Sequence, residues 1–303
     1  MTVTVPRHVL PGGLARRAEA LDKSAAWHIR QLDCSPEAFT LAFGTSSLAA
    51  LTHCGEDPRA ADLATWEAWV TAMQVGSALF ATSTATAGTV ECRIADEVRT
   101  LQAGGPQYAG NPENWISAFW LAIVCREPER LTALARVPVE VLRASGAECP
   151  GYVYPWVETL QTWWLRGGDL GASLDAAIAG TDPEGLHRED RSLMLRILYP
   201  PMNLFLFYVT ADHAGFNEAL ADALRWHREY WTGLDEGAGN SNSLVALGPL
   251  AMACLAYDAG FPLTIESDYL PRHLFAGSWV GEFDTLSGCC LSVRGCGVSA
   301  GQE

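Results

Sequence analysis

Apolar residues recur every three or four positions along most of this 303-residue chain, and this spacing predicts helices rather than strands. In residues 14–32, for example, Leu14, Ala18, Leu21 and Ala25 share one face of a helix. Alternating β-branched runs are few, and the hairpin dipeptides Asn-Gly and Asp-Gly do not occur. The sequence therefore predicts an all-α fold.

The predicted helices follow one another in antiparallel pairs with short connections. This order favours an irregular αα-solenoid or tetratricopeptide-like stack, with a compact bundle as the alternative because no fixed repeat recurs. Segment 89–101 is also predicted to be helical from Val90, Ile94, Val98 and Leu101. However, Val90, Cys92 and Ile94 also alternate with the charged residues between them. The other predicted helices are 14–32, 36–52, 61–81, 114–125, 129–136, 138–145, 153–166, 171–180, 186–199, 202–210, 213–231 and 243–259.

Residues 1–285 are predicted to form a single helical domain. The Gly-, Pro- and Asn-rich loop at 102–112 is the candidate division between two subdomains. Residues 286–303 lack a helical period and hold three of the nine cysteines, so they are predicted to be a disordered tail.

The chain is acidic, with 35 Asp and Glu against 20 Lys and Arg, a net charge of −15 and a pI near 4.8. This balance argues against nucleic acid and anionic membranes as partners, because both are bound through excess basic residues. Apolar stretches at 197–211 and 244–257 fall short of the roughly 20 residues of a membrane span, which predicts core helices. The first residues do not resemble a secretory signal, so a cytoplasmic location is expected.

Several catalytic signatures are absent from the sequence: there is no H-E-x-x-H, phosphate loop or G-x-G-x-x-G. We therefore expect no enzyme activity, cofactor or metal. The nearest arrangement to a metal site is Glu218 and Asp222, which share a helix face as bundle carboxylates do. The favoured interpretation is that they form the solvated side of an amphipathic helix whose apolar stripe includes Phe216, Leu220 and His227.

Two further features have both a structural and a functional interpretation. Among the 11 tryptophans, Trp115, Trp120, Trp163 and Trp164 either fill gaps between helices, which is favoured, or line an aromatic groove. Segment 266–273 is either a helix start capped by Ser267 or Asp268, or an exposed recognition loop.

Several long stretches resemble the immunity 49 family, whose members are all-helical proteins of bacterial polymorphic toxin systems. They include TWEAWVTAMQVGSALFATSTATAGTVECRI at 65–94, DHAGFNEALADALRWHREYW at 212–231 and LVALGPLAMACLAYDAGFPLTIESDYLPRHLF at 244–275. The resemblance implies a cytoplasmic antidote that binds and blocks a cognate toxin domain. It supplies no catalytic residue to carry over, and it ends near residue 284.

A basic nuclease would suit an acidic inhibitor, because opposite charges accelerate association. The alternatives are a tetratricopeptide-like interaction scaffold and an all-α enzyme with buried carboxylates. Charge reversal at Asp258 or Glu266 is expected to weaken partner binding without unfolding the chain. The candidate partner-binding residues are Asp258, Glu266, Asp268, Tyr269, Glu218 and Asp222.

Overall fold

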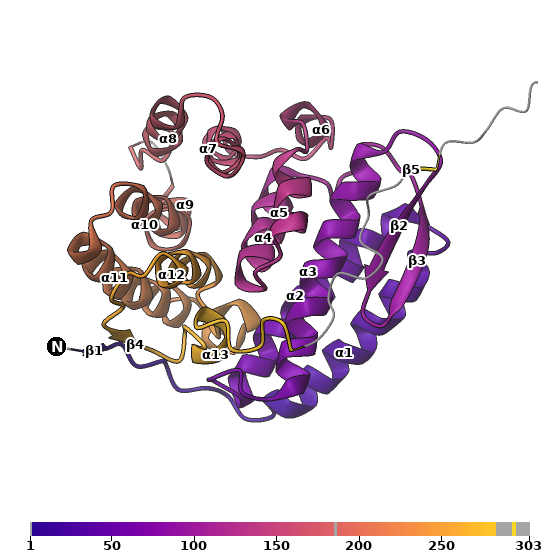
Figure 1. Cartoon of the computed structure of the whole chain (residues 1–303). Coiled ribbons are helices and arrows are strands. Elements are labelled where there is room, and N and C mark those ends of the chain that lie inside the picture. The colour runs from indigo at the N-terminus through magenta and orange to yellow at the C-terminus, as the bar shows by residue number, and fades with distance from the viewer. Residues whose placement is uncertain (1, 185–186, 283–292, 295–303) are drawn as a thin grey trace, which may run out of the picture.

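The computed structural model describes residues 2–184, 187–282 and 293–294, and it confirms a mostly helical, all-α fold (Figure 1). The first three helices are α1 (Leu14–Gln31), α2 (Phe39–Glu56) and α3 (Leu63–Thr84). Helix α2 packs against both α1 and α3, so it is the middle helix of this group.

The remaining helices continue the chain in an arc that passes from α4 over α6–α8 to α11 (Figure 1). Neighbours in sequence pack as pairs, among them α4 with α5, α7 with α8 and α10 with α11. These helices are α4 (Pro112–Val124), α5 (Pro128–Ala135), α6 (Val139–Arg143), α7 (Val153–Leu165), α8 (Leu170–Ala179), α9 (Arg188–Leu193), α10 (Pro200–Val209), α11 (His213–Thr232), α12 (Leu247–Asp258) and α13 (Arg272–Phe275). Short 3₁₀ turns lie at Pro36–Ala38, Gly237–Gly239 and Ser241–Ser243.

The predicted helix at 89–101 is wrong, because this segment forms a β-hairpin of β2 (Thr89–Ile94) and β3 (Glu97–Gln102). Val90, Cys92 and Ile94 are buried, so the alternation in β2 decided the structure. The turn between the strands is Ala95-Asp96, with Ala95 at a φ of 54° in place of the usual glycine or asparagine.

The prediction of a disordered tail at 286–303 falls almost entirely outside the described residues. The described exception is β5 (Val293–Arg294), which pairs antiparallel with Thr89 and Val90 of β2.

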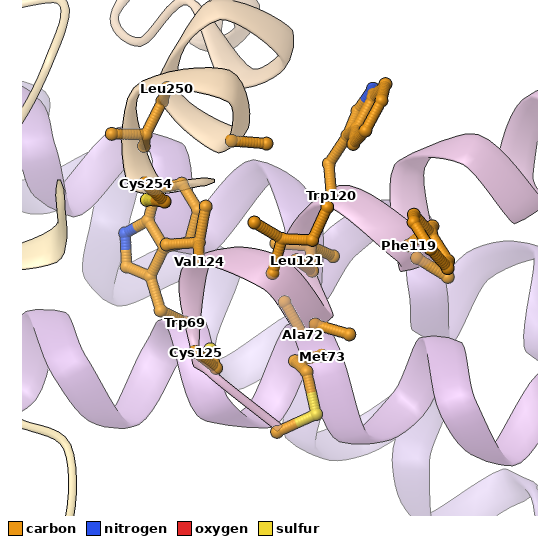
Figure 2. Packing of buried hydrophobic residues seen from close by; sticks show 14 of the residues in the cluster. Trp69, Ala72, Met73, Phe119, Trp120, Leu121, Val124, Cys125, Leu250 and Cys254 are labelled. Atoms are coloured by element: carbon orange, nitrogen blue, oxygen red, sulfur yellow. The ribbon is translucent and has the colours of Figure 1, made fainter. Parts of the chain in front are cut away.

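The core is one cluster whose members come from most of the helices between α1 and α13 and from both sides of the 102–112 loop. Figure 2 shows its centre, where Trp69 and Met73 of α3 lie beside Leu121 of α4 and Cys254 of α12. Close helix contact there requires Gly76, because a Cβ at this position would lie 2.8 Å from the Phe43 ring and 3.0 Å from Ala118.

Residues 2–13, here called the N-terminal strap, join the two ends of the arc. Strand β1 (Val3–Thr4) pairs in parallel with β4 (Ile265–Glu266). The Arg7 guanidinium donates to the Cys54 carbonyl at 2.8 Å, near the end of α2. The strap is therefore bonded both to the first helix group and to the last part of the chain.

One continuous helical stretch, Asp190–Val209, is long and apolar enough to cross a membrane by length and composition alone. It is longer than the sequence predicts, because Pro200 and Pro201 lie within it without ending it. A core helix passes the same test, and the predicted core role holds for part of this stretch. Its buried residues include Met194, Pro200, Pro201, Met202, Leu204 and Phe205.

Candidate partner-binding site

Glu218 and Asp222 lie on the outer side of α11 and are not buried. Asp222 forms an ion pair with Arg225 at 2.7 Å, and both carboxylates border a shallow hollow beside Pro262. The interpretation as a solvated helix face is confirmed, and the alternative in which these two carboxylates are buried is wrong. Within the described residues, no group of three or more His, Cys, Asp or Glu could hold a metal ion.

Asp258, at the end of α12, has a structural partner. The Arg126 side chain donates from Nε to Asp258 Oδ2 at 3.1 Å and from Nη1 to the Leu274 carbonyl at 2.6 Å. Arg126 itself occupies the turn after α4 with a positive φ of 55°. The Asp258 carboxylate thus helps to hold α4, α12 and α13 together, so its charge reversal is expected to lower stability as well as to change the surface.

Segment 266–273 matches neither of its two interpretations completely. Glu266 and Asp268 are exposed, but Tyr269 is fully buried and cannot touch a partner directly. No helix begins at Ser267 or Asp268, because α13 starts at Arg272 and has no side-chain cap. The Ser267 hydroxyl instead accepts from the Tyr269 amide at 3.2 Å.

Tyr269 belongs to a buried polar group that anchors the N-terminal strap. Its hydroxyl lies 2.8 Å from His8 Nδ1, and His8 Nε2 lies 3.1 Å from the Ala238 carbonyl. His227 packs edge-on against the Tyr269 ring, and its Nε2 donates to the Ser243 carbonyl at 3.1 Å. Burial lowers the pKa of His227 to about 4, so its ring is neutral at pH 7.

Beside His227 lies a cavity of about 380 Å³, here called the aromatic pocket. Trp120 of α4, Trp156 of α7 and Trp231 of α11 contribute its largest side chains. Gly248 is required on one wall, because a Cβ there would lie 2.5 Å from Cγ of Pro201. The wider lining is Leu51, Glu113, Ile116, Ser117, Tyr152, Val153, Arg196, Ile197, Leu198, Met202, Ala223, Asn242, Val245, Ala246, Leu247 and Pro249.

A π-helical turn forms the rim of the aromatic pocket. In Met194–Leu198 the helix widens, and the Tyr199 amide donates to the Met194 carbonyl at 2.9 Å. Such turns are rare and concentrate at functional sites. Trp231 adds a second irregularity, because its indole N–H is buried without a hydrogen-bond partner among the described residues. The pocket is suited to an apolar side chain.

The favoured interpretation, that these four tryptophans fill gaps between helices, is confirmed by their packing in or against the core, and the alternative of a groove fits Trp120 as well. Trp120 lines the pocket, whereas Trp115 is fully buried and donates to the Leu134 carbonyl at 2.9 Å. Trp163 packs on the Phe205 ring, and Trp164 donates to Thr132 Oγ1 at 3.0 Å. Trp156 and Trp231 were missed; the apolar stripe that ends at Trp231 was the available signal.

A second hollow of about 400 Å³, here called the acidic groove, lies along α2 between α1 and α3 and is bordered by the β2–β3 turn. Its charged lining includes Asp22, Glu67, Asp96 and Glu97. None of these four was among the predicted partner-binding residues, because they lie on three separate elements that only the fold brings together.

The sequence profile of the family described as immunity protein 49 matches residues 57–274. No curated protein and no solved structure matches the chain significantly. The matched span contains the whole lining of the aromatic pocket except Leu51. Of the acidic groove it contains the α3 side and the β2–β3 turn, whereas α1 and α2 precede it.

Proposed function

Because the chain belongs to the immunity protein 49 family, we propose that it binds a cognate toxin domain in the cytoplasm of the producing bacterium and neutralises it. The observation that carries this proposal is the family match across residues 57–274, which is most of the described chain. Protection requires only a stable complex that covers or distorts the toxin's active site, so no catalytic group is needed on this protein.

Two features of the structure support a binding role. The aromatic pocket offers a partly open apolar cavity, and interfaces gain most of their binding energy from anchor side chains that fill such cavities. The net charge of −15 would speed association with a basic toxin through electrostatic steering. A nuclease with a basic active cleft fits this charge.

The test is co-expression with the toxin domain encoded beside the gene for this chain, in a bacterium that lacks both. We expect the chain to restore growth and to co-purify with the toxin. A matched strain that expresses the toxin with an empty vector measures the toxicity that must be overcome. Failure to protect would overturn the proposed function, and binding without protection would favour an interaction scaffold.

The proposal that the toxin is a basic nuclease can be tested separately. With an inactive variant of the toxin, the association rate constant should fall at least about tenfold between low and high salt, since ions screen steering. An association rate that does not change with salt would contradict a basic toxin while leaving neutralisation in place.

A further inference from the structure

The acidic groove is hollow because the side chains that face it are small. Ala25 and Ala26 of α1, Ala49 of α2, and Ala64 and Ala68 of α3 line its walls. Larger residues at these positions would fill the space between three packed helices. A volume of about 400 Å³ lies within the range of natural ligand sites, roughly 300–1,000 Å³.

Carboxylates dominate the charges of the groove. Asp22, Glu67, Asp96 and Glu97 line it, and its cations are Arg30 and Arg99, with His53 beside them. Arg99 is already neutralised, because its guanidinium pairs with Asp33 at 2.7 Å and also with Glu97.

Two of the four groove carboxylates have no partner of their own. Asp22 bonds to His53 Nε2 at 3.0 Å, and Glu97 bonds to Arg99. Glu67 of α3 and Asp96 of the β2–β3 turn make no side-chain hydrogen bond or ion pair in the described part of the chain. Both are exposed to solvent and can accept bonds from an incoming cation.

The lining of the groove also includes a buried hydroxyl that lacks a partner. Ser46 of α2 is 1% exposed, and its Oγ has no hydrogen bond within the described residues. Two threonine hydroxyls on the same helix are satisfied, because Thr45 donates to the Leu41 carbonyl and Thr52 to the Leu48 carbonyl, both at 2.6 Å. Ser47 Oγ, which does not line the groove, has no hydrogen bond within the described residues either. A buried hydroxyl without a partner costs about 1–3 kcal/mol, so a ligand that bonds to it gains an advantage.

We infer that the acidic groove receives an arginine or lysine side chain from the toxin, an inference that rests on the proposed function. The cationic head would lie between Glu67 and Asp96, and its apolar stem would contact the alanines. A guanidinium or ammonium N–H would donate to Ser46 Oγ. The groove would thus be one specific site on an otherwise generally acidic chain at which a cationic side chain binds.

The first test uses a labelled hexa-arginine peptide as the probe and fluorescence anisotropy at low salt. The double variant Glu67→Lys/Asp96→Lys should weaken binding at least about tenfold, because it replaces two attractions with two repulsions. The control is Glu158→Lys/Asp175→Lys, which makes the same charge change on exposed residues of α7 and α8. This control should change the dissociation constant less than about twofold.

A second pair of variants tests whether the Ser46 hydroxyl itself contributes to peptide binding. Ser46→Ala should weaken peptide binding by about threefold to tenfold. Ser47→Ala is the matched control, because Ser47 Oγ is equally buried and unpartnered but Ser47 does not line the groove. It should leave peptide affinity unchanged.

Three results would each overturn the inference. They are equal losses of peptide affinity in the two double variants, no loss of affinity in the groove variant, and no peptide binding by the wild type. The growth assay keeps this result separate from the proposed function. If the wild-type chain fails to protect cells, the proposed function fails. If Glu67→Lys/Asp96→Lys protects cells and binds the toxin as well as the wild type, only the groove assignment fails.

Discussion

The aromatic pocket and the acidic groove have nearly equal volumes, about 380 and 400 Å³, but opposite construction. Large rings that also belong to the core surround the pocket, whereas the groove exists because alanines leave space between three helices. Almost all residues that line the pocket belong to the segment that matches the family, whereas about half of those that line the groove precede it. The comparison indicates that the pocket cannot change without affecting the fold, while the groove can change its recognition at little cost in stability.

The largest expected effect is that of Trp120→Ala in the pocket. Trp120 is 5% exposed and lies 6.0 Å from the Trp156 ring, so its removal leaves a cavity inside the core. We expect the free energy of unfolding to fall by about 3–5 kcal/mol. Chemical denaturation measures this loss, with Glu67→Ala in the groove as the control at less than about 0.5 kcal/mol. Equal losses at the two positions would remove the distinction between pocket and groove.

The next effect is a dependence of stability on pH that comes from His227 at the edge of the pocket. Its pKa is about 4 in the folded chain and 6.5 when unperturbed, so the unfolded chain binds more protons between these values. Stability should therefore fall as pH decreases from 6.5 to about 4, by on the order of 3 kcal/mol.

Unfolding curves of the wild type and His227→Gln at neutral and acidic pH would measure this contribution. In the variant, the difference in the free energy of unfolding between neutral and acidic pH should be much smaller than in the wild type. A small difference should remain because of His8, whose pKa is also lowered by burial. Identical pH dependence in the two proteins would show that His227 is not held neutral by the fold.

A smaller effect is expected from one added methyl group in the pocket wall. Gly248→Ala places a Cβ against the buried ring of Pro201 and should cost about 1–3 kcal/mol through overpacking. Gly44→Ala in α2 is the matched control, because nothing lies within 4 Å of its added Cβ. The control should be neutral or slightly stabilising, and thermal melting of both variants gives the comparison.

The smallest effect on stability is expected where a side chain is enlarged in the groove. Ala68→Leu fills part of an open hollow at a half-buried position, so the free energy of unfolding should change by less than about 0.5 kcal/mol. Binding of the hexa-arginine peptide should nevertheless weaken about tenfold, because the entry for the cation is blocked. A large loss of stability with unchanged peptide binding would contradict both parts of the comparison.

The helices could be predicted from the sequence because most of them bury one apolar stripe. The hairpin could not, since Val90, Ile94, Val98 and Leu101 satisfy helical spacing while alternation is confined to 90–94, and Ala95 carries no turn signal. The local sequence pattern therefore does not determine the secondary structure of this segment. The burial of alternate β2 residues against the rest of the fold determines it.

The candidate sites were harder to predict than the helices. The aromatic pocket joins residues from Leu51 to Pro249, and no local pattern connects positions so distant in sequence. Tyr269 was misjudged because three polar residues precede it, although its own side chain bonds to His8 at the other end of the chain. Partner-binding surfaces of this kind depend on tertiary assembly rather than on spacing.

The N-terminal strap has a consequence for the order of events during synthesis. Val3 emerges from the ribosome early, but its pairing partner Ile265 emerges 262 residues later. At translation rates of about 5–20 residues per second, the strap waits for tens of seconds before its strand can form. Closure of β1 on β4 therefore has to wait until helices α1 to α12 have been synthesised. A newly made chain acquires its complete surface only after synthesis of the described helices has ended.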